Sequence, residues 1–168
     1  MVLVRRRTGL ILVGVMVGLC AVGFVFPLRT SPQKAYERFC YSADLAEDQL
    51  MDPLILAGDK VAPLVIDGIK NPDMPRRRYA IQFLGNASSK ESLPVLRSIL
   101  ANEQEPETVR ADALLAIVAI QGEEGAGVAK EYAGASGFLA ETSRGILSGH
   151  QTLPEKRTYW DAFWGRHD

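Results

Sequence analysis

The sequence predicts an all-α protein in which one transmembrane helix precedes a short α-solenoid of stacked helical hairpins. Residues 8–26 carry no charge, apolar residues then recur at helical spacing, and two hairpin-length stretches repeat each other. The expected organisation is a basic tail at 1–7, a transmembrane anchor or signal segment at 8–28, a membrane-proximal helix with a degenerate first repeat at 29–58, repeats at 59–150 and an aromatic cap at 151–168.

The uncharged run at 8–26 is typical of a membrane anchor, because its residues would span ~28 Å as a helix, close to the thickness of the hydrocarbon core. Three arginines at 5–7 precede it and favour a cytoplasmic N-terminus. The remaining chain is therefore expected on the non-cytoplasmic side of a bacterial-type plasma membrane. The alternative is a signal peptide cleaved near 21–23, which would give a secreted or periplasmic protein. The apolar run continues beyond that position, which favours the anchor.

The part of the chain after the apolar run is acidic. Four of the 19 Lys and Arg residues precede Thr30, whereas none of the 20 Asp and Glu residues do, so the rest has a net charge near −5. This balance argues against nucleic-acid binding, which needs a basic surface. Cys40 is the one cysteine after Thr30, so no disulfide is expected within this part, and a packed thiol is the favoured interpretation.

The first expected helix of this part begins at Pro32, with the Ser31 hydroxyl as its cap, and runs to about Met51. The apolar segment “PLILAG” then forms a short helix or turn that Gly58 ends. This segment is interpreted as the remnant of a preceding repeat.

Two hairpins repeat each other between residues 61 and 120. Each has a first helix with an apolar stripe, a break at “NPDMP” or “NEQEP”, and a second helix at 76–85 or 109–120. Because these second helices are mostly apolar, neighbouring hairpins have to cover them, and the units are expected to stack. The stripes are Val61, Leu64, Val65 and Ile69, then Leu93, Leu96, Ile99 and Leu100. The matched positions are Pro63 with Pro94, Asn71 with Asn102, Arg77 with Arg110 and Ala80 with Ala113, and Leu84 and Ile117 are also assigned to the repeat core.

The stretches “KVAPLVIDGIKNPDMPRRRYAIQFLG” and “ESLPVLRSILANEQEPETVRADALLAIVAIQG” resemble HEAT repeats, particularly the short bacterial HEAT-like type also found in phycobilisome lyases. The resemblance implies that the inner-helix arginine of each unit pairs with turn acids along the stack, a structural role for Arg77 and Arg110. The chain departs from the family at Val118, where glycine is common, and has the usual turn aspartate only as Asp73.

A third, glycine-rich helical pair is expected at 123–132 and 138–147. The C-terminal stretch “TYWDAFWGRHD” then places four aromatic side chains on one helical face. These rings either seal the end of the stack or form a docking surface, because Trp and Tyr are enriched at interface anchors. The four residues are Tyr159, Trp160, Phe163 and Trp164.

The sequence contains no recognisable arrangement of catalytic residues, metal ligands or nucleotide-binding loop, so no enzyme activity, metal or cofactor is expected. The expected function is that of a membrane-anchored adaptor or scaffold that binds another protein, of unknown identity. The candidate partner-binding residues are Arg76 and Arg78, in a positive island of an acidic domain, and Trp160 and Trp164. The alternatives are a relative of bilin lyases, which the family resemblance implies would attach a chromophore, and a secreted HEAT-repeat binding protein.

Overall fold

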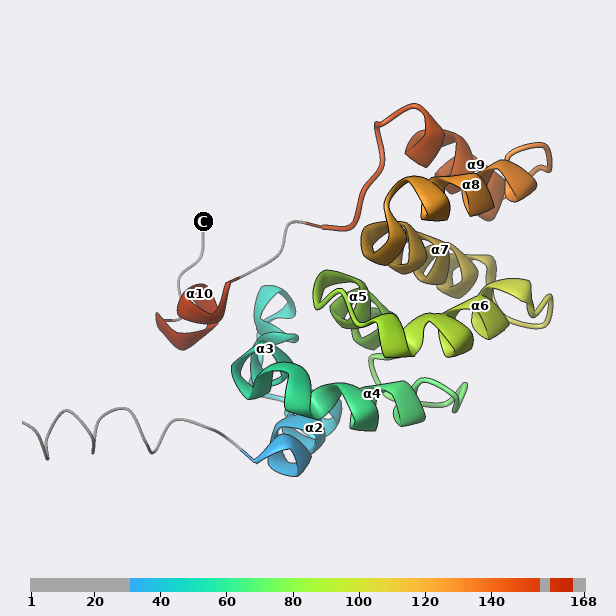
Figure 1. The fold of residues 1–168 in the computed structure, drawn as a ribbon. Coiled ribbons are helices and arrows are strands. Elements are labelled where there is room, and N and C mark those ends of the chain that lie inside the picture. Colours follow the sequence, from blue (N-terminus) through green and yellow to red (C-terminus); the bar gives the residue numbers. More distant parts are fainter. Residues whose placement is uncertain (1–30, 155–157, 165–168) are drawn as a thin grey trace, which may run out of the picture. The chain divides into compact units, whose positions relative to one another are not determined.

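The computed structural model describes residues 31–154 and 158–164, and all regular structure among them is helical, with no strand (Figure 1). The all-α prediction is therefore confirmed. Within these residues, no helix has the length and apolar character needed to cross a membrane. The expected anchor at 8–26 lies outside the described residues, so it stays a prediction.

The first helix, α2 (Pro32–Tyr41), is shorter than the sequence pattern suggested. Pro32 occupies its first turn as expected, but the Ser31 side chain makes no capping hydrogen bond. The prediction that this helix reaches Met51 is wrong, because Ser42 adopts an extended conformation and ends it. A short 3₁₀ turn, η1 (Glu47–Gln49), follows before the next helix begins.

Helix α3 (Asp52–Ala57) contains the “PLILA” segment and ends where Gly58 adopts a φ of 66°, in the left-handed region that favours glycine. The 3₁₀ turn η2 (Gly58–Val61) then leads directly into the next helix. Helix α3 packs against α2, and α2 also contacts α4, so α2 and α3 form a first helical unit that adjoins the repeated hairpins.

The two repeated hairpins are α4 (Ala62–Gly68) with α5 (Arg77–Asn86), and α6 (Leu93–Ala101) with α7 (Glu107–Gln121), which the 3₁₀ turn η3 (Lys90–Ser92) separates. Helix α7 packs against α5, α6, α8 and α9. This environment explains its composition, since an apolar helix that is covered by several neighbours needs few polar residues. Its buried side chains include Leu114 and Ile117, which are fully enclosed.

The third pair is α8 (Glu123–Tyr132) with α9 (Phe138–Leu147), and these limits coincide with the expected ones. The last described helix, α10 (Tyr159–Trp164), contacts α3 and lies apart from α9 (Figure 1).

Gly85 lies where α5 and α7 approach each other and where the returning chain crosses them. A Cβ atom at this position would lie 2.5 Å from Leu153 Cδ1 and 2.8 Å from Ala116 Cα. Glycine is therefore required for the close packing of these helices and for the position of the Leu153 side chain.

The residues of the common core come from every helix between α2 and α9, so the described pairs share one hydrophobic core.

Candidate partner-binding surface

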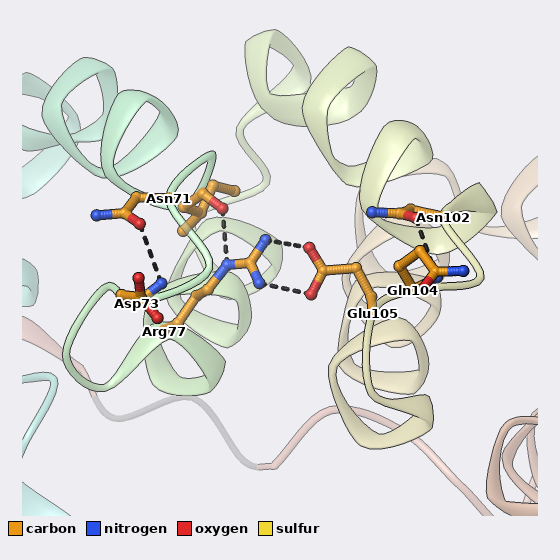
Figure 2. Close-up of polar contacts among 7 residues, drawn as sticks. Asn71, Asp73, Arg77, Asn102, Gln104 and Glu105 are labelled. Atoms are coloured by element: carbon orange, nitrogen blue, oxygen red, sulfur yellow. Dashed lines mark hydrogen bonds and ion pairs between the residues drawn. The ribbon is translucent and has the colours of Figure 1, made fainter.

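The repeated hairpins are joined by a buried arginine–carboxylate contact. Arg77, the first residue of α5, donates two hydrogen bonds from its Nη atoms to Glu105 in the α6–α7 turn, at 2.6 and 2.7 Å (Figure 2). Its Nε atom donates to the Ile69 carbonyl at 2.7 Å, beyond the end of α4. The side chains of Arg77 and Glu105 are only 7% and 8% exposed. The contact therefore holds the second hairpin in register with the first.

The turns of the two hairpins also repeat each other. Asn71 Oδ1 accepts the backbone N–H of Asp73, and Asn102 Oδ1 accepts the backbone N–H of Gln104, each at 3.0 Å (Figure 2). These side-chain bonds satisfy backbone N–H groups of the turns themselves, as is typical of asparagine in a turn. The acid that binds Arg77 is Glu105, whereas the turn aspartate singled out from the sequence, Asp73, is exposed.

Arg110 repeats only half of the Arg77 contact. Its Nε atom donates to the Leu100 carbonyl at 2.8 Å, as that of Arg77 does to Ile69. Its guanidinium lies 6.0 Å from the ring centroid of Tyr132. Within 31–154 and 158–164, no carboxylate forms an ion pair with it.

The structure gives Arg76 an internal role. Arg76 adopts a left-handed conformation, with φ at 57°, and its guanidinium donates hydrogen bonds to the carbonyls of Phe39 and Ser42 at the end of α2. Arg76 therefore connects the start of α5 to the preceding helical unit, a contact that the sequence alone did not suggest.

Arg78 also has a partner inside the molecule. Its Nε atom lies 2.5 Å from Asp112 Oδ2 of α7, and the hydrogen bond to that carboxylate raises the pKa of Arg78. Gln82 donates a further bond to Asp112 Oδ1 at 3.3 Å. The Arg78 side chain is nevertheless 50% exposed, so part of it faces solvent. The positive island predicted from the sequence is thus largely used for contacts between helices.

Most of the aromatic side chains of α10 remain on the surface. Trp160 and Trp164 are each 62% exposed, whereas Ala162 is buried. The predicted clustering of the four rings is observed: Phe163 lies edge-on to Trp160 and Trp164, with centroid distances of 5.9 and 4.8 Å, and stacks on Tyr159. Two large apolar side chains on adjacent turns of one helix are therefore presented to solvent.

A cavity of about 320 Å³ lies between α3, α5 and α10. Its walls are mostly apolar and include Met51, Ile55, Phe83 and Ala87, with Tyr159 contributed by α10. Tyr159 thus belongs both to the aromatic cluster and to the wall of the cavity.

The remaining positions that the sequence assigned to the repeat lie inside the helical pairs. Pro63 and Pro94 occupy the first turns of α4 and α6. The four small or branched positions are fully buried; they are Ala80, Leu84, Ala113 and Ile117.

The surroundings of two further groups, the Cys40 thiol and the Tyr36 hydroxyl, raise their pKa values. Burial raises the pKa of the Cys40 thiol, and burial together with the neighbouring Cys40 raises the pKa of Tyr36 to about 12.

Among the described residues, no group of three or more His, Cys, Asp or Glu side chains is placed to hold a metal ion.

Comparison with known proteins does not place the chain in a family: no family model, no curated protein and no solved structure matches it.

Proposed function

We propose that this protein is a membrane-anchored adaptor whose helical pairs form a short HEAT-like array and whose α10 surface binds another protein. The observation that carries the proposal is the exposure of Trp160 and Trp164, 62% each, on a helix that is itself packed against α3. Tryptophan is the residue type most enriched among side chains that dominate protein–protein binding energy. A docking role accounts for the exposure of two tryptophans on adjacent turns of one helix.

The array supports this role because α10 packs against α3, and Leu54 of α3 belongs to the shared core. The Arg77–Glu105 contact and the shared core restrict movement between hairpins. A preorganised surface loses less conformational entropy on binding than a flexible one, so the same contact area gives a higher affinity. The membrane part of the proposal rests on the uncharged run at 8–26 and the arginines before it.

Site-specific crosslinking in membranes tests the proposal. A photoreactive amino acid replaces Trp160 or Trp164 in the full chain, and Leu147 of α9, an exposed apolar residue on another helix, serves as the matched control. We expect adducts with one defined protein from positions 160 and 164 and none from 147. Absence of adducts from both tryptophan positions, or equal adducts from all three positions, would contradict the proposal.

A further inference from the structure

The third turn of the molecule, residues 133–137, aligns with the second turn, residues 102–106, without a gap. Helix α6 ends at Ala101 and α8 at Tyr132, and α7 begins at Glu107 and α9 at Phe138, so both limits differ by 31. At this offset, Ser136 takes the position of Glu105. Ser136 is exposed, and a serine hydroxyl cannot supply the charged pair of acceptor oxygens that Glu105 provides.

Arg77 binds the second turn through Glu105, and Arg110 lies beside Tyr132, the residue that directly precedes the third turn. The Nε atoms of both arginines donate to a carbonyl at the end of the outer helix of their own pair, at 2.8 and 2.7 Å. This bond orients the planar guanidinium, so the outer Nη atoms of Arg110 are placed for two parallel hydrogen bonds. The two Nη atoms of an arginine form a hydrogen-bonding fork. The fork of Arg77 binds Glu105, whereas the fork of Arg110 binds no carboxylate among the described residues.

The surroundings of Arg110 leave the fork accessible. The third turn consists of small residues, and a Cβ atom at Gly134 would meet nothing within 4 Å. Arg110 is partly buried against the Tyr132 ring. A partly desolvated guanidinium binds a carboxylate more strongly than a fully hydrated one does.

The charged neighbours of this turn already have other roles. Glu107 accepts the backbone N–H of Phe138 at 2.6 Å, which directs its carboxylate to the start of α9. Arg144 donates from Nη1 to the carbonyls of Ala133 and Ala135, and adds a second positive charge at the same turn.

From this geometry we infer that Arg110 and the 133–137 turn form a binding site for an acidic side chain, Asp or Glu, of a protein partner. The inference rests on the proposed protein-binding function, although it concerns a different surface from α10. One fork provides too few contacts to hold a small free acid against the entropy lost on association, so the carboxylate must belong to a larger molecule that supplies the remaining contact area.

A glutamate introduced at position 136 of the third turn tests whether the Arg110 guanidinium can bind a carboxylate. We compare Ser136→Glu with Ser136→Gln in the full chain, each in the wild-type and in the Arg110→Gln background. If the fork is available, the new glutamate raises the Tm by about 2–4 °C when Arg110 is present. The increase should disappear with Arg110→Gln, and the neutral glutamine should not reproduce it. Equal effects of Ser136→Glu in both backgrounds would overturn the inference, as would no stabilisation in either.

A peptide titration then tests the ligand class. A hexaglutamate peptide is added to the ¹⁵N-labelled full chain, and the Nε–H signals of Arg110 and of Arg97, whose side chain is half exposed, are followed by NMR. We expect a saturable shift of the Arg110 signal that exceeds that of Arg97, that Ser136→Glu abolishes, and that hexaglutamine does not cause. An Arg110 signal that stays in place, or that moves equally in Ser136→Glu, would refute a carboxylate site. These results do not depend on adducts at α10, so failure of the proposed function and failure of this inference are distinguishable.

Discussion

Breaking the Arg77–Glu105 contact should lower the stability of the protein more than breaking any exposed ion pair. The substitution Glu105→Gln keeps the size of the side chain but removes its charge. Arg77 then stays buried, at 7% exposure, with a charge that no carboxylate balances. Removal of one partner of a buried pair typically costs about 3–5 kcal/mol. For a domain of this size, that cost corresponds to a decrease in Tm of roughly 10–20 °C.

The matched control is the exposed pair of Lys70 and Asp67, whose side chains are 61% and 81% exposed at a distance of 3.0 Å. Asp67→Asn should cost at most about 1 kcal/mol, because solvent screens this pair. Urea unfolding of the full chain in detergent, followed by far-ultraviolet circular dichroism, measures both variants. The urea dependence should keep its slope, so that a shift in midpoint reports stability.

A double substitution separates the contact from simple loss of packing. Arg77→Met with Glu105→Leu removes both charges, and its cost should be smaller than the summed costs of Arg77→Met alone and Glu105→Leu alone. Equal midpoints for Glu105→Gln and Asp67→Asn would refute the reasoning, as would strictly additive effects in the double variant. Either result would mean that this contact does not hold the two hairpins together.

Three further predictions concern packing, the thiol and the membrane. Gly85→Ala should destabilise the protein by about 1–3 kcal/mol because its new methyl group meets Leu153 Cδ1 and Ala116 Cα. In the same urea assay, Gly127→Ala, in a helix and with open space around it, should stabilise it by about 0.5–1 kcal/mol, and equal effects would contradict the packing described. In a Cys20→Ser background, Cys40 should react with iodoacetamide at pH 8 far more slowly than after unfolding in urea, because burial both shields the thiol and raises its pKa; comparable rates would show that the thiol is accessible. Alkaline carbonate washing of membranes should leave the chain in the pellet if residues 8–26 span the bilayer, whereas release would refute an uncleaved anchor.

The helical pairs could be predicted because their signals are local. Apolar spacing, the two proline-containing breaks and the repeat offset located α4 to α7, and the expectation of a degenerate final pair located α8 and α9. The first helix was predicted too long because the apolar and acidic residues after Tyr41 continue a helical pattern, although the backbone leaves the helix at Ser42.

The contacts that involve the three consecutive arginines could be predicted only in part. The family resemblance implied a turn acid for Arg77, but the sequence did not identify Glu105, since Asp73 lies in the nearer turn. The partners of Arg76 and Arg78 are 34 or more residues distant in sequence, and only the tertiary structure brings them together. The 31-residue offset between turns would have drawn attention to Glu105 and Ser136 as corresponding positions.

The contact of α10 with α3 could not be predicted from the sequence either. Its aromatic spacing predicted a cluster of rings, but a six-residue helix at the end of the chain has no local signal for the surface that it contacts. The structure places it on α3, which belongs to the first helical unit. As a result, Tyr159 of the cluster lines a cavity while the two tryptophans stay exposed.

The most direct test of the central claim is the affinity of the purified full chain for the protein that crosslinks to α10. Trp160→Ala and Trp164→Ala should each weaken binding by roughly 30-fold or more, the effect of losing about 2 kcal/mol at an interface anchor. Leu147→Ala, on the exposed surface of α9, should change the Kd less than twofold, and all three variants should keep the wild-type Tm. Tryptophan variants that are folded and bind with wild-type affinity would contradict the claim that α10 is the docking surface.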